Sequence, residues 1–275
     1  MKKLYYWKFT ADAPFDFDVQ FFPAPAFNPV MDFHDSIHLN LILDHGMDGK
    51  VGNTLFHLER YDLQVTAPWE LHGENRMKKG LRLLSITADP DMLLENLIGY
   101  REAALSLLLL EPRERHRIIN SPATRELRME RSAALPAISG DDPEIIKIRR
   151  WLAIQGMLAE LLHCIKAEDL PEASFRLYRK VAPALALFKS GRQIALQEAA
   201  DACALSASRF RHIFRQACRM SFSEFEMRNR LSHAGSLLRQ GLHLKDVAEQ
   251  TGFYDSSHLT RFFRRYLGMT PGKFR

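Results

Sequence analysis

The pattern of hydrophobic and polar positions divides this 275-residue chain into a strand-rich first part and a helical remainder. Between residues 37 and 87, short apolar stretches alternate with turn residues such as Gly46, Gly49 and Gly52. Short strands at such close spacing are typical of a small β-barrel or sandwich. The predicted strands are residues 37–43, 54–58, 62–66 and 81–87. The first thirty residues are dense in aromatics and prolines, which favours an extended arm with edge strands.

Beyond Pro90 the pattern becomes helical. Residues 92–110 are rich in leucine, alanine and glutamate and predict a first helix. Asp142-Pro143-Glu144 predicts the start of another, because it combines a good N-cap, a proline at the first helical position and an acid that favours the helix dipole. This helix, expected at 143–167, is apolar over much of its circumference and should cover its own core and a second surface. A further helix over 182–188 leads into residues 189–192, which we interpret as a linker.

Residues 194–275 contain one pattern twice. The apolar positions of the first copy recur in the second with an offset of 49 residues: Phe210, Ile213, Phe214 and Ala217 are matched by Leu259, Phe262, Phe263 and Tyr266. Each copy predicts a short helix, a tight turn and a second helix that begins at a good N-cap, Ser206 or Asp255. Repetition of such a unit indicates two helix-turn-helix elements.

The second helix of each copy has a polar face opposite its apolar stripe. The candidate base-contacting residues are Ser208, Arg211, His212 and Arg215 in the first copy and Ser256, Ser257, Thr260 and Arg261 in the second. Neither set contains an acid, whereas a face that is merely solvated normally mixes both charges. Arginine can read guanine O6 and N7, and small hydroxyl residues allow close approach to base edges, so the pattern predicts DNA recognition.

The charge distribution and the predicted spacing agree with DNA binding. Residues 189–275 hold 15 Lys and Arg against 7 Asp and Glu, whereas residues 1–188 hold 23 against 26. The helix that joins the copies, 222–240, would be ~28 Å long and could set two recognition helices about one DNA turn, ~34 Å, apart. The candidate phosphate contacts are Arg228, Arg230, Lys245, Arg264, Arg265 and Lys273.

Specific short runs mark the second copy. They are Asp246-Val247-Ala248, Gly252-Phe253, the run from 257 to 265, Gly268-Met269-Thr270-Pro271 and Phe274-Arg275. Over these residues, and over less than a third of the chain, the sequence resembles the DNA-binding domain of the AraC/XylS family of bacterial transcription regulators. The first copy departs from the family pattern at Arg219, where the family usually has a glycine in the left-handed conformation, so mild strain is expected there.

The N-terminal strands carry a second resemblance. Asp62-Leu63 followed by Pro68-Trp69-Glu70-Leu71-His72 is similar to a strand–turn–histidine passage of the cupin-like effector domain common in that family. The resemblance implies an α+β chain: a small cupin-like β-barrel or jelly roll with flanking helices, then an all-α domain of two helix-turn-helix units joined by a long helix. The implied domains are residues 1–88 for the effector-binding barrel, 89–188 for a helical region that completes this domain, and 189–275 for DNA binding. By the same analogy, the helix at 143–167 would form part of a dimer interface.

Polar residues on the predicted strands are candidates for binding a small-molecule effector. His38 and Asn40 share one strand face, Gln64 and Arg82 lie on later strands, and Trp69 could stack on a sugar ring. The full candidate set is His38, Asn40, Gln64, Trp69, His72 and Arg82. Such a set suits a carbohydrate, but it also suits many other metabolites.

Catalysis is the main alternative. Cupin enzymes hold a metal with closely spaced histidines and a carboxylate, but His34 and His38 are four residues apart rather than two. The chain contains no G-x-S-x-G, P-loop, H-E-x-x-H or G-x-G-x-x-G motif, so we expect neither an enzyme nor a bound metal or cofactor. A cupin metalloenzyme with an appended DNA-binding domain, and a dimeric DNA-binding protein without an effector, stay open as alternatives.

Composition limits the remaining classes. With 46% hydrophobic and 26% charged residues the chain is globular rather than disordered. It has no apolar run of the ~18–20 residues that a membrane span needs and no recognisable export signal. Its three cysteines include no C-x-x-C pair, which argues against a disulfide framework. We therefore expect a cytoplasmic, homodimeric transcription regulator that binds double-stranded DNA and a small molecule and does not bind membranes.

Overall fold

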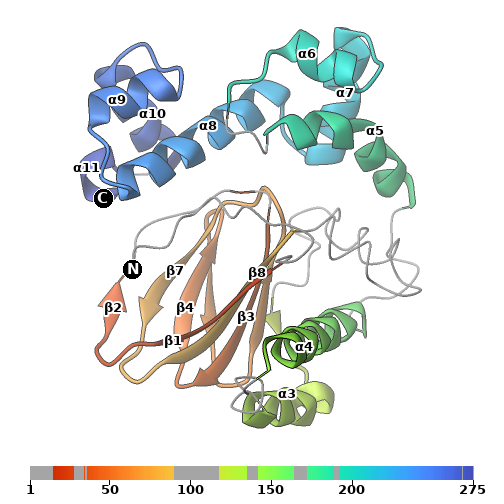
Figure 1. Cartoon of the computed structure of the whole chain (residues 1–275), viewed down its shortest axis with the longest axis vertical. Helices are drawn as coiled ribbons and strands as arrows, with labels where there is room; N and C mark the ends of the chain where they lie inside the picture. Colours follow the sequence, from red (N-terminus) through yellow and green to blue (C-terminus); the bar gives the residue numbers. More distant parts are fainter. Residues whose placement is uncertain are drawn as a thin grey trace. The chain divides into compact units, whose positions relative to one another are not determined.

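The computed structural model describes residues 15–27, 34, 36–89, 118–134, 142–163, 172–188, 192–267 and 269–274. It contains two compact units: one comprises the β-strands with helices α3 and α4, and the other comprises helices α5 to α11 (Figure 1). The predicted fold class, a β-rich domain followed by an all-α domain with two helix-turn-helix units, is confirmed. The helix predicted at 92–110 lies outside the described residues.

The first unit is built from two antiparallel sheets. The five-stranded sheet has the order β1 (Phe15–Phe21), β8 (Arg82–Ala88), β3 (Ile37–Asp44), β6 (Leu63–Thr66) and β9 (Ile118–Ile119). The four-stranded sheet has the order β2 (Ala26–Phe27), β7 (His72–Met77), β4 (Met47–Val51) and β5 (Thr54–Leu58). The four predicted strands are present, and β1 and β2 are edge strands, as the proline-rich start of the chain suggested.

Three strands, β4, β7 and the two-residue β9, were not predicted. The sequence interpretation placed a turn at Gly49, but this glycine lies inside β4, where a Cβ atom would come within 3.2 Å of the Gln64 side chain. The glycine therefore serves the close approach of β4 to the opposite sheet rather than a turn.

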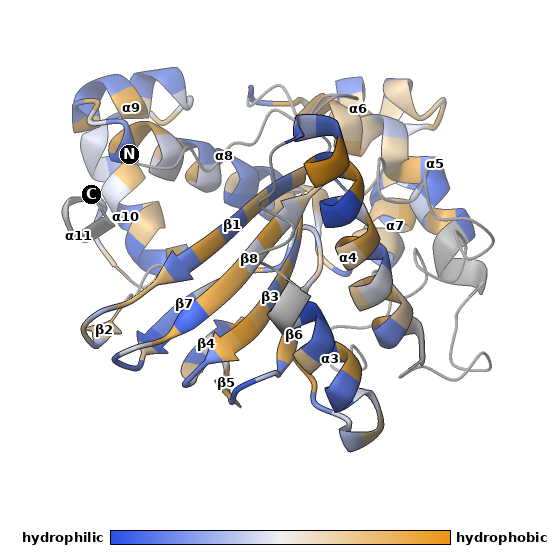
Figure 2. Ribbon diagram, turned by 60° about the horizontal axis from the view of Figure 1, so that its bottom comes forward, coloured by the Kyte–Doolittle hydropathy of each residue, from blue (hydrophilic) through white to orange (hydrophobic). Residues whose placement is uncertain are grey.

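Alternation along β3 gives this sheet two different faces. Leu39, Leu41 and Leu43 belong to the larger core, together with Ile154 and other residues of α4. The opposite face of β3 carries His38, Asn40 and Ile42, and Ile42 packs with side chains of the four-stranded sheet in a smaller core. His38 and Asn40 therefore face the space between the two sheets. Figure 2 shows that hydrophobic residues predominate along β3 and β8.

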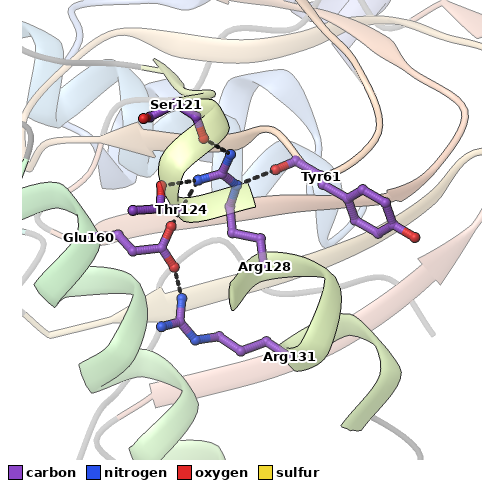
Figure 3. Close-up of polar contacts among 6 residues, drawn as sticks. All are labelled: Tyr61, Ser121, Thr124, Arg128, Arg131 and Glu160. Carbon is purple, nitrogen blue, oxygen red and sulfur yellow. Dashed lines mark hydrogen bonds and ion pairs between the residues drawn. The ribbon is translucent and has the colours of Figure 1, made fainter. Parts of the chain in front are cut away.

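Helices α3 (Pro122–Ala134) and α4 (Pro143–His163) are joined by a buried ionic cluster (Figure 3). Arg128, 1% exposed, donates hydrogen bonds to the Tyr61 carbonyl (2.5 Å), the Thr124 hydroxyl (2.7 Å) and Glu160 (2.9 Å). It also reaches the Ser121 carbonyl at 3.1 Å, while Arg131 pairs with the other oxygen of Glu160. Burial and the like charge of Arg128 lower the pKa of Arg131. The cluster fixes both helices to each other and to the turn that contains Tyr61.

Helix α4 begins as predicted and exposes an apolar face. The Asp142 carboxylate accepts a hydrogen bond from the Glu144 backbone at 2.9 Å, which is the expected N-cap. Trp151 stacks on Phe15 of β1, with ring centroids 5.9 Å apart, so one side of the helix covers the sheet. Ile145, Ile148 and Leu152 are 47%, 58% and 63% exposed and form a second apolar face, as the circumferential pattern indicated.

The second unit contains the two predicted helix-turn-helix elements, the helix that links them and one further helix at each end. Its elements are α5 (Glu172–Phe188), α6 (Leu196–Ala202), α7 (Ala207–Cys218), α8 (Phe222–Arg239), α9 (Leu244–Gln250), α10 (Ser256–Leu267) and α11 (Pro271–Phe274). Within the described residues, no helix is long and apolar enough to cross a membrane.

The boundary between the units lies earlier than the predicted residue 189. Helix α5 belongs to the second unit, because Phe188 is fully buried against Phe222 (5.9 Å between ring centroids) and Phe225 (5.0 Å) of α8. The glycine-containing segment 189–192 was interpreted as a domain linker, but it joins two helices of the same unit. The composition of residues 189–192 does not reveal which of the two units the preceding helix packs against.

Candidate nucleic-acid interface and ligand site

Helix α7 presents the first predicted reading face. Its buried residues are Phe210, Ile213, Phe214 and Ala217, as the repeat predicted. Ser206 caps the helix by accepting a hydrogen bond from the Arg209 backbone at 3.3 Å. The four candidate base-contacting residues on the opposite side, Ser208, Arg211, His212 and Arg215, are all exposed. The face is therefore accessible, basic and held in place by an aromatic underside.

Helix α10 presents the second reading face. Leu259 and Phe263 are buried below it, and Asp255 accepts a hydrogen bond from the His258 backbone at 2.6 Å. His258 in turn accepts one from the Tyr254 backbone through Nδ1 at 3.2 Å, so its ring ties the preceding turn to the start of the helix. An open hollow lies over the helix and is lined by Leu244, Ser256, Ser257, Thr260, Arg261, Arg264 and Arg265. The structure thus brings the predicted residues of α10 together on one surface.

The candidate phosphate contacts divide into two groups. Lys245, Arg264 and Arg265 are exposed, and Arg265 rests over the Tyr266 ring at 5.7 Å. Arg228 is half-buried and pairs with Glu224 of its own helix at 2.7 Å. Arg230 is only 13% exposed and its guanidinium contacts other parts of the second unit, which does not support its predicted role as a phosphate contact. The side chain of Lys273 lies outside the described residues.

Both helix-turn-helix turns use a left-handed residue. The first has Ala204 at φ 52° and the second has Gly252 at φ 69°, at equivalent positions of the repeat. Arg219 ends α7 in the left-handed region with φ 58°, as its departure from the family glycine predicted. The first helix-turn-helix element therefore carries two non-glycine residues in a conformation that glycine adopts more easily.

The inner faces of the two sheets bring most of the predicted effector residues together. Asn40 pairs with Gln64 in the β3–β6 register, and His38 pairs with Thr66. His38 and His72 meet edge to face with ring centroids 4.9 Å apart, and His72 donates from Nδ1 to the Glu70 carbonyl at 2.7 Å. His38, Asn40, Gln64 and His72 thus lie in one region between the sheets.

Three buried oxygens in this region are unsatisfied. Asn40 and Gln64 are 3% exposed and Thr66 is fully buried. Asn40 Oδ1, Gln64 Oε1 and Thr66 Oγ1 have no hydrogen-bond partner in the part of the chain that the structure describes. Buried polar atoms without a partner each cost free energy, so such a group is usually completed by water or by a ligand.

The prediction for Arg82 is wrong, because the side chain lies on the other face of β8. Leu83 and Ser85 have the inward position of the alternation, whereas Arg82 shares the outward position of Leu84. Arg82 is half-exposed and pairs with Asp44 at 3.3 Å. Trp69 is half-buried in the turn between β6 and β7, with φ 60°, and its stacking role stays a prediction.

Sequence reasoning missed three inward residues, Thr66, Ser85 and Thr87. Thr87 contacts His38 Nε2 through its hydroxyl at 3.3 Å, and Ser85 lies opposite Asn40 in the β3–β8 register. The signal was available, since polar residues alternate with Leu84 and Ile86 in this strand. Applying the same alternation would also have excluded Arg82.

Comparison with known proteins supports the assignment of the second unit. A helix-turn-helix domain family model matches residues 199–275. The transcriptional regulator RipA of Corynebacterium glutamicum is 38% identical over 82 residues, which are 30% of this chain and 25% of that protein. The transcriptional activator RhaR of Yersinia pseudotuberculosis is 41% identical over 66 residues, which are 24% of this chain and 23% of that protein. The residues that the family model matches include those that resemble the AraC/XylS pattern.

The chain carries an AraC/XylS-family helix-turn-helix domain. It spans about a quarter of the length of the curated relatives that it matches. A crystal structure of ToxT from Vibrio cholerae has the same fold, with a TM-score of 0.59 and 12% identity over 95% of this chain and 97% of that one.

Proposed function

We propose that this chain is a DNA-binding transcription regulator that reads two adjacent major grooves with α7 and α10. The observation that carries the proposal is the pair of exposed, arginine-bearing faces without acidic residues, each backed by a buried stripe. Helix α8 has 18 residues and is therefore ~27 Å long, a suitable rod for two half-sites about one turn apart. A protein that acts on bacterial DNA would work in the cytoplasm.

Separating the roles of the arginines tests this proposal. Arg211→Ala and Arg261→Ala should each relax sequence choice at one base pair and cost ~1–3 kcal/mol on the preferred sequence. Arg265→Ala should weaken binding to all duplexes about equally and reduce the dependence of affinity on salt. Affinities for selected and scrambled duplexes at several salt concentrations measure both effects. Equal behaviour of the two kinds of variant on every duplex would contradict the assignment of the reading faces.

The space between the two sheets is the proposed effector site, with His38, Asn40, Gln64 and His72 as ligand-contacting residues. Three buried side-chain oxygens of this site, on Asn40, Gln64 and Thr66, can accept hydrogen bonds from a ligand. This favours a small molecule that carries hydroxyl groups, such as a sugar. A fatty acid is the second candidate, because a ToxT structure of the same fold is described as bound to an unsaturated fatty acid.

A thermal-shift screen against sugars and fatty acids separates these two ligand classes. A ligand present at a hundred times its dissociation constant should stabilise the chain by about 2.7 kcal/mol. Asn40→Leu should abolish the shift with a sugar and affect a fatty acid less, whereas His57→Ala, on an exposed residue of β5, should leave either shift unchanged. The absence of any ligand-induced shift would favour the effector-independent alternative.

The exposed apolar face of α4 is the proposed homodimer contact. Ile145, Ile148 and Leu152 lie at positions i, i+3 and i+7 and therefore line one side of the helix. Leu152→Glu should shift the sedimentation of the full chain from dimer to monomer. Leu55→Glu is the matched control, because Leu55 is equally exposed (60%) but lies on β5. A chain that stays dimeric after Leu152→Glu would refute the α4 interface.

Metal analysis addresses the metalloenzyme alternative. DNA binding by α7 and α10 requires no metal, so treatment with a chelator should leave DNA affinity in the absence of effector unchanged. Stoichiometric metal that is lost in His72→Ala would instead favour a cupin-type metal centre.

A further inference from the structure

Arg230 of α8 contacts the turn of the second helix-turn-helix element from several directions. Its Nη1 donates a hydrogen bond to the Gly252 carbonyl at 3.0 Å, and its guanidinium carbon lies 4.7 Å from the centre of the Phe253 ring. On its own helix it pairs with Glu226 at 3.4 Å and reaches the Met227 sulfur at 3.9 Å. The side chain therefore joins the linking helix to the turn between α9 and α10.

The turn that Arg230 contacts leads directly to the recognition helix. Phe253 is 4% exposed, and its ring packs against His258 (5.5 Å between centroids) and Phe262 (6.0 Å), both on α10. The Phe253 backbone also donates to the Ala248 carbonyl at 2.8 Å, which fixes the ring relative to α9. A shift of the guanidinium would thus be transmitted through one aromatic ring to α10.

Gly252 allows this contact to be close. Its φ of 69° suits glycine, and a Cβ atom there would lie 2.9 Å from the Gln193 side chain and 3.5 Å from Arg230 Nη1. Gln193 precedes α6 of the first helix-turn-helix element. Side chains from the segment before α6 and from the linking helix therefore both lie close to Gly252.

We propose that Arg230 is a positioning residue that fixes α10 relative to α8 and thereby sets the base-pair spacing between the two half-sites. The inference rests on the proposed function. On B-form DNA, one additional base pair turns a half-site by about 35° and moves it ~3.4 Å along the axis. Two reading helices on a braced rod fit one spacing only. Without the brace, α10 can rotate to follow a half-site that has moved.

The test compares duplexes that differ only in this spacing. The full-length chain first selects its preferred sequence from a random duplex library, and the two half-sites are located by footprinting. Duplexes with one base pair added or removed between the half-sites are then prepared. The wild-type chain should bind the altered duplexes about tenfold more weakly or worse, because misplaced base contacts typically have an effect of that size. Arg230→Met should reduce this difference to about threefold or less.

Two further variants control for charge and for folding. Arg228→Met removes a cation of the same helix that pairs with Glu224, also on that helix. This variant should weaken binding to all three duplexes by the same factor and keep the spacing preference. Arg230→Lys keeps the charge but not the planar fork and should give an intermediate spacing preference. Phe253→Leu removes the ring under the guanidinium and should act like Arg230→Met, which provides a second route if Arg230→Met does not fold.

Each outcome decides between the hypotheses. A folded Arg230→Met chain, verified by its helical circular dichroism, that keeps the full spacing preference would overturn the inference. So would a uniform loss on all three duplexes like that of Arg228→Met, since this would make Arg230 a phosphate contact. A wild-type chain that selects a sequence but tolerates altered spacing also overturns it. A wild-type chain that selects no sequence would instead contradict the proposed function.

Discussion

The buried ionic cluster of α3 and α4 allows a quantitative prediction. Replacing Glu160 by glutamine leaves two arginines, Arg128 and Arg131, without the carboxylate that balances them. Arg128 and Glu160 are 1% and 3% exposed, so water cannot replace the lost charge. Breaking a buried pair by removing one partner typically costs about 3–5 kcal/mol, and we expect Glu160→Gln to lower the free energy of unfolding by that amount.

A second substitution separates charge from hydrogen bonding. Arg128→Met leaves Glu160 paired with Arg131 but removes the donors to the Tyr61 and Ser121 carbonyls. Unsatisfied acceptors of this kind cost about 1–3 kcal/mol each, partly offset by the packing of methionine, so a loss of about 2–4 kcal/mol is expected. The free energy of unfolding lost in the double variant should be about 1–3 kcal/mol smaller than the sum of the losses in the two single variants, because the two side chains contact each other.

Urea unfolding followed by tryptophan fluorescence is a suitable assay. Trp69 and Trp151 lie in the same unit as the cluster, so their fluorescence reports the unfolding of that unit. Arg82→Met is the control, since it breaks the half-exposed pair with Asp44 and should cost at most about 1 kcal/mol. If Glu160→Gln cost no more than Arg82→Met, burial would not be what makes this cluster important, and the desolvation argument would be refuted.

Three further predictions concern the second unit. Ala204→Gly should stabilise the chain by roughly 0.5–1 kcal/mol because it relieves a left-handed alanine, whereas Ala202→Gly at the exposed end of α6 should destabilise it by a similar amount; chemical unfolding followed by circular dichroism measures both. Burial raises the pKa of Glu226, so the folded state binds the proton of this carboxyl group more tightly than the unfolded state does. The free energy of unfolding of the wild type should therefore fall relative to that of Glu226→Gln as the pH rises above about 4.5. Unfolding measured at several pH values tests this, and a relative stability that rises with pH would contradict it. The Thr260 hydroxyl donates a hydrogen bond to the Ser256 carbonyl at 2.8 Å, so we expect its methyl group, rather than its hydroxyl, to contact the DNA. Thr260→Val should therefore bind DNA like the wild type, whereas Thr260→Ser and a thymine-to-uracil exchange in the half-site should each weaken binding. Weak DNA binding by Thr260→Val would contradict this prediction.

The helix-turn-helix elements could be predicted from sequence because their signals are local. The apolar stripe of α7, Phe210 to Ala217, has the helical period and lies between a serine N-cap and the end of the helix. The outward residues follow from the same period without knowledge of any other part of the chain. For the same reason, β3 and β8 were recognised from their alternating pattern.

Residues whose role depends on distant partners could not be assigned in this way. Nothing near Arg230 in the sequence indicates that it lies beside Phe253, 23 residues later, rather than in solvent. Gly49 was interpreted as a turn because its close neighbour, Gln64, comes from the opposite sheet. Arg82 was different, since the alternation of its own strand contained the correct answer and the polar character of the side chain was given too much weight.

The aromatic contacts of α5 bear on how the DNA-binding part of this protein should be produced as a fragment. A polypeptide cut at the linker-like residues 189–192 would lack Phe188 and would leave the rings of Phe222 and Phe225 facing water. Losing a buried phenylalanine typically costs about 3–5 kcal/mol, a large share of the stability of a small domain. An expression fragment that starts near Pro171 keeps this contact, and one that starts at Lys189 should be prone to unfolding and aggregation.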